Sequence, residues 1–412
     1  MRKILVIVFL LCSLEGYSDL NNDVSLHAMV ELVAKDSYER SKIAEIIHVD
    51  YVWGDRVFSA VSLRDYNKLI KSDSITIINA EIIYNPNSSD AVYNPYTSRI
   101  EFPAGEEKFH TYDEMYSEFN ELAQKNPNLV TIFSIGKSYE GKDIWALKIT
   151  EHDPINNLIA KPASVFMGTH HAREHISTEV PILFAKELVK SFDIDEDIKK
   201  LLKETEIYII PMVNPDGAMH DIVNRRYKYW RKNRRDNKDG SFGVDLNRNY
   251  KYGFGTGGSS SDPYSDIYMG EYAFSEPETS SIRDFFLSHE NISVALSFHT
   301  YSELILYPWG GRYSSVGGDD EAVFVKMAND MSLMNNYTPM QSSELYIASG
   351  DTCDWAYGER GVFCFTFELS PATRFEGGFY PGAKAIDRIY ENNLKAILYL
   401  AKSAKDPYMS VR

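Results

Sequence analysis

Two side chains of metal-ligating type, His171 and Glu174, lie three residues apart in this chain of 412 residues. Apolar residues recur at helical spacing over residues 182–189, so we expect a helix that starts within the His171 segment and points both side chains the same way. A catalytic zinc site needs three protein ligands of this type and one position for water. His299, much further along the chain, is our candidate for the third ligand.

The same letters support a second interpretation of this segment. Residues 171–175 spell H-x-x-E-H, a motif in which both histidines bind the metal and the glutamate is the catalytic base. This alternative makes His175 a ligand and Glu174 the base of an endopeptidase, and it requires a further acidic ligand downstream. The local motif alone does not separate the two interpretations.

Several other polar residues follow strands that the sequence predicts. Continuous apolar runs lie at residues 163–167, 207–213, 294–298 and 362–367. They alternate with helical or loop-rich stretches, which is typical of an α/β domain with a mixed, largely parallel central sheet flanked by helices. His299 and Glu368 directly follow two of these runs, and residues 214–217 follow another. Because ligands collect outside the carboxyl ends of such strands, we expect these residues at one edge of the sheet.

The N-terminal part has shorter and more quickly alternating elements. Two basic residues, a short apolar run and then small residues predict a secretory signal peptide at residues 1–18. Residues 19–83 show the order strand, helix, strand, strand, helix, strand, which predicts a small ferredoxin-like α+β domain. The expected strands are 27–34, 48–52, 57–61 and 75–83, with helices at 37–47 and 63–70.

After the small domain we expect a linker at residues 84–108, a large domain at 109–405 and a tail at 406–412.

Composition and charge limit the location and the partners of the protein. The formal net charge of −16 disfavours nucleic acid as a partner. The signal peptide predicts a secreted or periplasmic protein with no membrane segment after its removal, and we expect a monomer. Only Cys353 and Cys364 remain in the mature chain, which is therefore no disulfide-stapled scaffold, and whether they pair stays open.

A series of motifs in one order carries a specific resemblance. The motifs lie at residues 168–174, 214–217, 229–232, 243–249, 273–279, 297–301 and 365–369. From about His110 to the C-terminus the chain resembles the metallocarboxypeptidases of the pancreatic carboxypeptidase A type. The resemblance implies one Zn²⁺ per chain, held by His171, Glu174 and His299. The family usually has an aromatic residue at the position of His175, so the H-x-x-E-H spelling reflects that single replacement.

The resemblance also implies roles for the residues around the metal. Glu368 resembles the general base, and Arg231 resembles the residue that polarises the scissile carbonyl. Asn247 and Arg248 resemble the anchor for the free carboxylate of a peptide or protein C-terminus, to which a guanidinium fork is suited. Two further residues, Tyr346 and Arg173, are expected to contact substrate.

Substrate selectivity and activation are expected from positions in the same family pattern. Cys353 stands at the main selectivity position, and Asp351 is close enough in sequence to reach the same pocket. We expect a preference for apolar or aromatic C-terminal residues with some tolerance of Lys or Arg. The small N-terminal domain resembles an inhibitory prodomain, which an activating protease would release at Arg99 or Lys108.

Two further alternatives stay open beside the H-x-x-E-H endopeptidase. One is a relative that binds peptide tails without hydrolysing them. This is disfavoured by the presence of the metal ligands, the carboxylate anchor and Glu368 together. The other is an amidohydrolase of N-acyl amino acids or cell-wall peptides, which shares much of the zinc chemistry.

Overall fold

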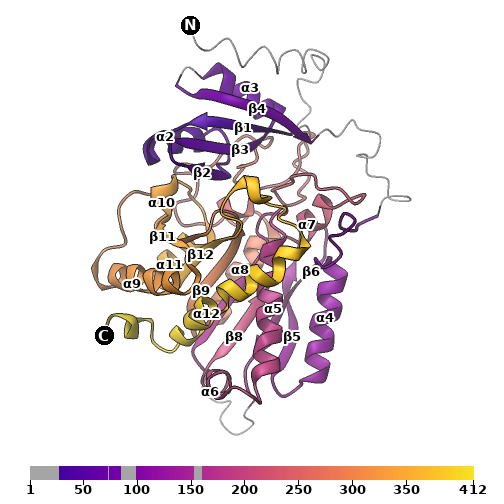
Figure 1. Ribbon diagram of the computed structural model, residues 1–412, viewed down its shortest axis with the longest axis vertical. Coiled ribbons are helices and arrows are strands. Elements are labelled where there is room, and N and C mark those ends of the chain that lie inside the picture. Colours follow the sequence, from indigo (N-terminus) through magenta and orange to yellow (C-terminus); the bar gives the residue numbers. More distant parts are fainter. Residues whose placement is uncertain (1–26, 73, 85–98, 153–159) are drawn as a thin grey trace.

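The computed structural model describes residues 27–72, 74–84, 99–152 and 160–412 (Figure 1). The expected signal peptide at 1–18 and most of the linker fall outside these residues. Two sheets organise the described chain, one with four strands near the N-terminus and one with eight strands in the remainder. Within the described ranges, no helix has the length and apolar character needed to cross a membrane.

The N-terminal domain has the element order expected for residues 19–83. Its sheet has the order β2-β3-β1-β4, with antiparallel pairs throughout. The elements are β1 (His27–Val33), α2 (Ser37–Ala44), β2 (Tyr51–Trp53), β3 (Arg56–Ser62), α3 (Leu63–Lys71) and β4 (Thr76–Tyr84). The second strand begins at Tyr51, three residues later than expected. Residues 48–50 line a cavity against the large domain, and the backbone nitrogen of Asp50 still donates to the carbonyl of Phe58 in β3 at 3.0 Å.

The large domain has the mixed sheet that the sequence predicts, in the order β11-β10-β12-β9-β7-β8-β6-β5. Its strands are β5 (Val130–Lys137), β6 (Asp143–Ile149), β7 (Ala163–Met167), β8 (Glu206–Ile210), β9 (Ile292–Thr300), β10 (Leu304–Tyr307), β11 (Thr338–Gln341) and β12 (Phe363–Leu369). The four central strands β12, β9, β7 and β8 run parallel, and antiparallel pairs flank them on both sides. The parallel centre therefore presents its carboxyl ends at one edge.

Helices cover both faces of this sheet (Figure 1). The helices are α4 (Tyr112–Lys125), α5 (Ile176–Ser191), α6 (Glu196–Glu204), α7 (Pro215–Asp221), α8 (Pro277–Ser288), α9 (Gly318–Asn335), α10 (Ser342–Leu345), α11 (Thr352–Arg360) and α12 (Ile386–Ser403). The expected tail contains a short 3₁₀ helix, Pro407–Val411, whose Tyr408 hydroxyl donates to Asp320 of α9.

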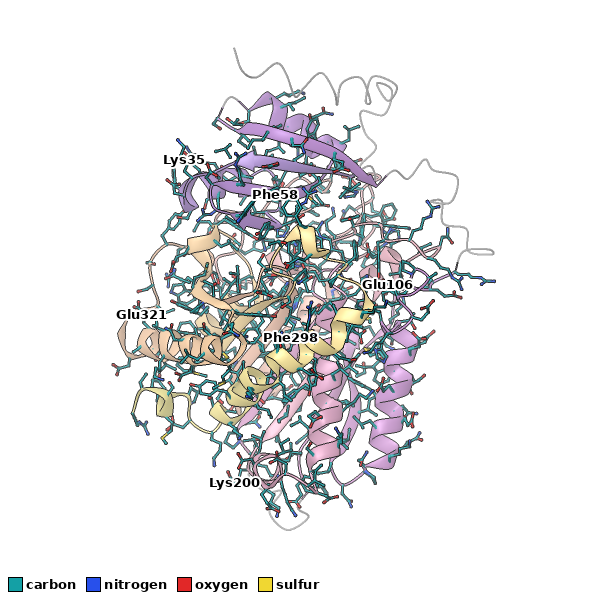
Figure 2. All side chains as sticks on the ribbon, viewed as in Figure 1. Lys35, Phe58, Glu106, Lys200, Phe298 and Glu321 are labelled. Carbon is teal, nitrogen blue, oxygen red and sulfur yellow. A yellow bond between two sulfur atoms is a disulfide. The ribbon has the colours of Figure 1, made fainter. Side chains whose placement is uncertain are left out.

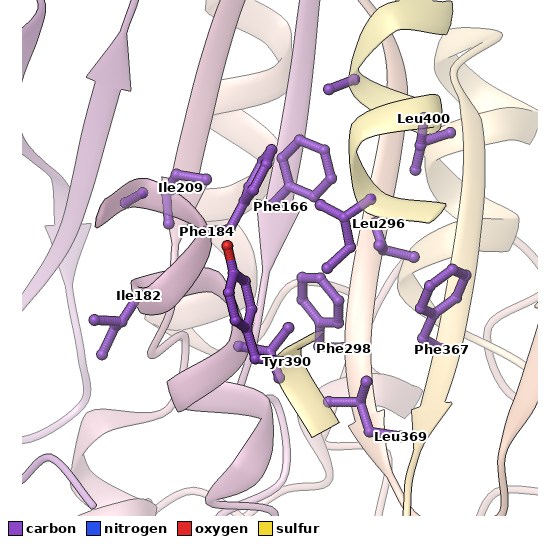
Figure 3. Packing of buried hydrophobic residues seen from close by; sticks show 14 of the residues in the cluster. Phe166, Ile182, Phe184, Ile209, Leu296, Phe298, Phe367, Leu369, Tyr390 and Leu400 are labelled. Carbon is purple, nitrogen blue, oxygen red and sulfur yellow. The ribbon is translucent and has the colours of Figure 1, made fainter. Parts of the chain in front are cut away.

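The core explains why the central strands are apolar without alternation. Successive residues of a strand point to opposite faces, and here both faces are covered. Phe166 of β7 packs in the cluster that includes Phe184 of α5 and Leu400 of α12, as Figure 3 shows. Its neighbour Val165 packs in the opposite cluster, with Phe285 of α8. The sheet is thus held rigidly between two apolar layers, which fixes the positions of its strand ends.

The N-terminal domain docks over those strand ends (Figures 1 and 2). Arg40 of α2 donates from Nε to the carbonyl of Leu345 at 2.6 Å and from Nη2 to that of Glu344 at 2.8 Å. Lys68 of α3 lies 3.0 Å from Asp262 of the large domain. The two domains therefore contact each other through specific polar interactions on both helices of the small domain.

Candidate metal centre and substrate cavity

Three buried side chains converge at the carboxyl edge of the central strands. His171, Glu174 and His299 each bring a ligand atom within 4.8 Å of the others. Nδ1 of His299 lies 3.1 Å from Nδ1 of His171 and 2.9 Å from Oε2 of Glu174. Nδ1 of His171 lies 2.8 Å from Oε1 of Glu174. Two imidazole nitrogens and one carboxylate form the donor set of a catalytic zinc site, so this triad fits a zinc ion.

The backbone around the triad differs from the expected one in one detail. Helix α5 begins at Ile176, so His171 and Glu174 lie in the turn between β7 and the helix and not in its first turn. His299 comes from β9, which pairs with β7. Neighbouring parallel strands thus bring ligands together that are far apart in sequence.

The outer nitrogens of both histidines are held by other side chains. Nε2 of His171 lies 3.1 Å from Oδ1 of Asp245, and Nε2 of His299 lies 3.1 Å from the hydroxyl of Ser297. Such partners fix the ring orientation and leave the other nitrogen to face a metal. Burial alone would raise the pKa of Glu174, but His171 and His299 outweigh it and lower that pKa far below its ordinary value. The carboxylate is therefore charged, as a metal ligand has to be.

His175 points away from the metal centre. Its Nε2 lies 2.9 Å from Oδ2 of Asp221, and its ring packs edge-on against Phe102 at a centroid distance of 4.9 Å. The group of ligand atoms found within the described ranges does not include His175. This geometry contradicts the H-x-x-E-H interpretation, because the second histidine of that motif has to bind the metal.

Arg231 presents one free nitrogen toward the metal centre. Its Nε and Nη2 donate to Oδ2 of Asp245 at 3.0 and 2.8 Å, which fixes the plane of the guanidinium. Its Nη1 is buried, has no hydrogen-bond partner among the described residues, and lies 4.0 Å from Oε1 of Glu174. A fixed, unpaired donor beside a metal site is suited to stabilise a developing oxyanion.

Glu368 lies beside His299 in the sheet, because the two are register partners in the parallel pair β12–β9. Its side chain lines the same cavity as the metal triad. Burial, together with the nearby charge of Glu174, raises the pKa of Glu368 to about 8. A carboxyl group with a pKa near neutrality can both take up and release a proton at working pH.

Asn247 and Arg248 line this cavity from a 3₁₀ turn, Leu246–Arg248. Oδ1 of Asn247 accepts from the backbone nitrogen and the hydroxyl of Thr352, at 2.9 and 2.8 Å. Arg248 donates from Nε to the carbonyl of Gly258 at 2.7 Å and from Nη1 to that of Asn247 at 2.8 Å. Both side chains are thus held in one orientation before any ligand arrives.

Two residues that we expect to contact substrate, Tyr346 and Arg173, contact the N-terminal domain in this structure. The hydroxyl of Tyr346 donates to the carbonyl of Val49 at 3.3 Å. Nη2 of Arg173 donates to Oδ1 of Asp50 at 2.6 Å, and both side chains are inaccessible to solvent. The guanidinium of Arg173 also stacks on Phe379, 4.2 Å from the ring centroid. Arg173 does not line the cavity in this closed arrangement.

The cavity between the domains has a volume of about 350 Å³ and contains a buried carboxylate at one side. Asp351 lines it, and its Oδ2 has no hydrogen-bond partner among the described residues. Cys353 does not line this cavity, and its sulfur forms a disulfide with Cys364. Its sulfur accepts a weak hydrogen bond at 3.6 Å from Thr366, which does line the cavity.

Three residues near the metal were not selected from the sequence. Asp245 lies in the motif at 243–249, but an aspartate before a turn is more commonly a cap, and this one also caps the Leu246–Arg248 turn. His48 and Asp50 reach the site from another domain, and no local pattern indicates such a contact.

Comparisons with known proteins agree with this geometry. The model of the zinc carboxypeptidase family, peptidase M14, matches residues 115–396. Human carboxypeptidase A1 is 34% identical over 310 residues, which cover 73% of this chain and 71% of that protein. Rat carboxypeptidase A1 is 28% identical, and the match covers 99% of this chain and all of that protein (100%).

Solved structures extend the likeness to both domains. Carboxypeptidase A from Helicoverpa armigera superposes with a TM-score of 0.74 at 26% identity, covering 92% of this chain and 97% of that one. Thrombin-activatable fibrinolysis inhibitor superposes with a TM-score of 0.71 at 25% identity, covering 92% of this chain and 100% of that one. The family match, the fold and the His-Glu-His triad lead to one conclusion: this chain belongs to the zinc carboxypeptidases of family M14.

Proposed function

We propose that this chain is the secreted precursor of a zinc carboxypeptidase that releases single residues from peptide or protein C-termini. One observation carries the proposal. The zinc triad, the unpaired Nη1 of Arg231, Glu368 and the fixed fork of Arg248 all line one cavity. Arg248 can bind a terminal carboxylate in this cavity, and Arg231 can bind the oxygen of the scissile carbonyl. This preference for a terminal charge disfavours internal peptide bonds.

The proposed chemistry assigns one task to each side chain. Zinc, when bound, supplies a Lewis acid and lowers the pKa of a water molecule. Glu368 takes the proton of the attacking water and passes it to the leaving amine. Arg231 donates from Nη1 to the oxygen on which negative charge develops. Asn247 and Arg248 hold the terminal carboxylate, and Tyr346 closes over the substrate.

The cavity supports a mixed selectivity for the C-terminal side chain. Leu304, Leu306 and Met340 contribute apolar surface. Asp351 adds a buried carboxylate oxygen that has no partner among the described residues. An apolar wall accommodates Phe or Leu, and the carboxylate offers Lys or Arg a charge-assisted contact. We therefore propose apolar and aromatic residues as preferred substrates, with basic residues tolerated.

The full-length chain is proposed to be latent. The N-terminal domain occupies the groups that a substrate would need, since Asp50 pairs with Arg173 and Val49 accepts from Tyr346. Arg99 and Lys108 are exposed and follow the domain in sequence, which suits cleavage by a trypsin-like protease. The signal-peptide pattern of residues 1–18 supports secretion.

Mass spectrometry of a defined peptide mixture tests this function. The chain is treated with trypsin, the trypsin is then inhibited, and the peptides are incubated with and without a zinc chelator. We expect stepwise loss of C-terminal residues that the chelator abolishes. Cleavage at internal bonds, or peptide binding without hydrolysis in a zinc-loaded sample, contradicts the proposal. Equal activity before and after trypsin contradicts the proposed latency alone.

A further inference from the structure

The N-terminal domain places a histidine inside the cavity of the metal centre. His48 lies in the loop between α2 and β2, and its side chain is 10% exposed. It lines the cavity together with His171, Glu174 and His299. The imidazole and the metal triad therefore share one cavity.

The position of His48 fits contact with the metal through one water molecule. Its ring centroid lies 6.1 Å from that of His171, whereas the centroids of His171 and His299 are 4.7 Å apart. In the described chain, His48 is not part of the group whose ligand atoms lie within 4.8 Å of one another. A direct zinc–nitrogen bond is about 2 Å long, and a hydrogen bond to a bound water adds roughly 2.8 Å. The larger separation of His48 suits the second case.

The hydrogen bonding of His48 is incomplete within the described chain. Its Nδ1 is buried and has no partner among the described residues. Its Nε2 lies 3.5 Å from Oδ1 of Asp50, an oxygen that already accepts from Arg173 at 2.6 Å. Burial, with the charges of Arg231, Arg173 and Arg248 next in order, holds the pKa of His48 well below its ordinary value. A neutral imidazole offers one nitrogen that accepts a hydrogen bond.

We propose that His48 accepts a hydrogen bond from the water at the open position of the metal, so that the N-terminal domain blocks the reacting centre directly. The neighbouring residues act in the same direction, since Val49 binds Tyr346 and Asp50 binds Arg173. Three consecutive residues of one loop thus engage the metal position and two groups proposed to contact substrate. The inference rests on the proposed latency of the full-length chain.

The visible absorption spectrum of the cobalt-substituted full-length chain tests this contact, because it reports the surroundings of the metal without requiring turnover. We expect His48→Ala to shift the cobalt bands. Free imidazole fills the vacated space, so titration with imidazole should return the bands to the wild-type positions in a saturable way. The wild-type spectrum should not respond to the same imidazole concentrations, because His48 already fills that space.

His27→Ala is the matched control. It also removes a buried imidazole of the N-terminal domain that faces the large domain, where Nε2 lies 3.9 Å from Asp266, but His27 does not line the cavity. We expect its cobalt spectrum to be that of the wild type. An unchanged spectrum for His48→Ala, or an equal shift in both variants, overturns the proposal. Latency itself is measured separately, as the gain in turnover on trypsin treatment. A failure of the proposed latency can therefore be told apart from a failure of the proposed His48 contact.

Discussion

Asp351→Asn changes one charge in the substrate cavity with little effect on the backbone. Oδ1 of Asp351 accepts from the backbone nitrogens of Cys353 and Asp354 at 2.8 and 2.9 Å, which caps helix α11. Asparagine is an equally good N-cap and keeps that oxygen. Oδ2 has no hydrogen-bond partner among the described residues, and the variant replaces it by an uncharged group. Burial and the charge of Asp351 together raise the pKa of the neighbouring Asp354, and substrates ending in Phe or Leu show what the loss of that charge alone does to turnover.

The magnitude follows from the type of contact that is lost. A hydrogen bond between a charged pair contributes about 1.5–3 kcal/mol, which corresponds to roughly a 10- to 150-fold change in kcat/KM. We expect that loss for substrates ending in Lys or Arg and a change of less than about twofold for Phe or Leu. Burial raises the pKa of Asp351, so turnover of basic substrates should also fall, relative to Phe, as the pH drops through that raised value.

The assay compares kcat/KM for acyl dipeptides ending in Phe, Leu, Lys and Arg, after trypsin treatment of the wild type and of both variants. Asp284→Asn, which changes an exposed carboxylate of α8, controls for the loss of one negative charge. An unchanged ratio of Lys to Phe turnover in Asp351→Asn would refute the reasoning. So would a preference of the wild type for substrates ending in Glu.

Three other predictions concern groups around this cavity and at the start of the large domain. Asp245→Ala frees both His171 and Arg231, so we expect zinc affinity, measured by competition with a chelator, to fall about 10- to 100-fold; unchanged affinity contradicts the positioning role. Replacing Cys353 and Cys364 together by alanine should lower the free energy of unfolding by about 3 kcal/mol, as measured by denaturant titration; equal stability contradicts the disulfide. Burial lowers the pKa of His110, but hydrogen bonds to Glu118 and Glu179 outweigh it and raise that pKa to about 10. A raised pKa stabilises the folded state fully below the unfolded value of 6.5 and less as the pH rises to about 10. The stability lost in His110→Gln should shrink over that range, and a constant difference contradicts the interaction.

The sequence indicates the framework of the site because that framework follows from local patterns. Apolar runs such as residues 163–167 became buried central strands, since only a sheet covered on both faces tolerates them. Strand ends then bring His171 and His299 to one edge of the sheet. The order of elements in the small domain follows from its rapid alternation in the same way.

Contacts between distant segments could not be read from these patterns. His171 and His175 belong to the same motif, and only the pairing of His175 with Asp221 separates a ligand from a packed side chain. The pairing of Cys353 with Cys364 depends on how α11 packs against β12. His48 and Asp50 belong to the small domain and gain a role only when it docks.

Zinc content and turnover of Glu368→Gln, measured beside Glu174→Ala, test the central assignment most directly. A base is needed for proton transfer but not for metal binding, so Glu368→Gln should keep one zinc per chain and lose turnover by about 10²- to 10⁴-fold after trypsin treatment. Glu174→Ala should lose the zinc, because it removes one of the three ligands. The reverse pattern, with zinc lost in Glu368→Gln and retained in Glu174→Ala, would contradict the account.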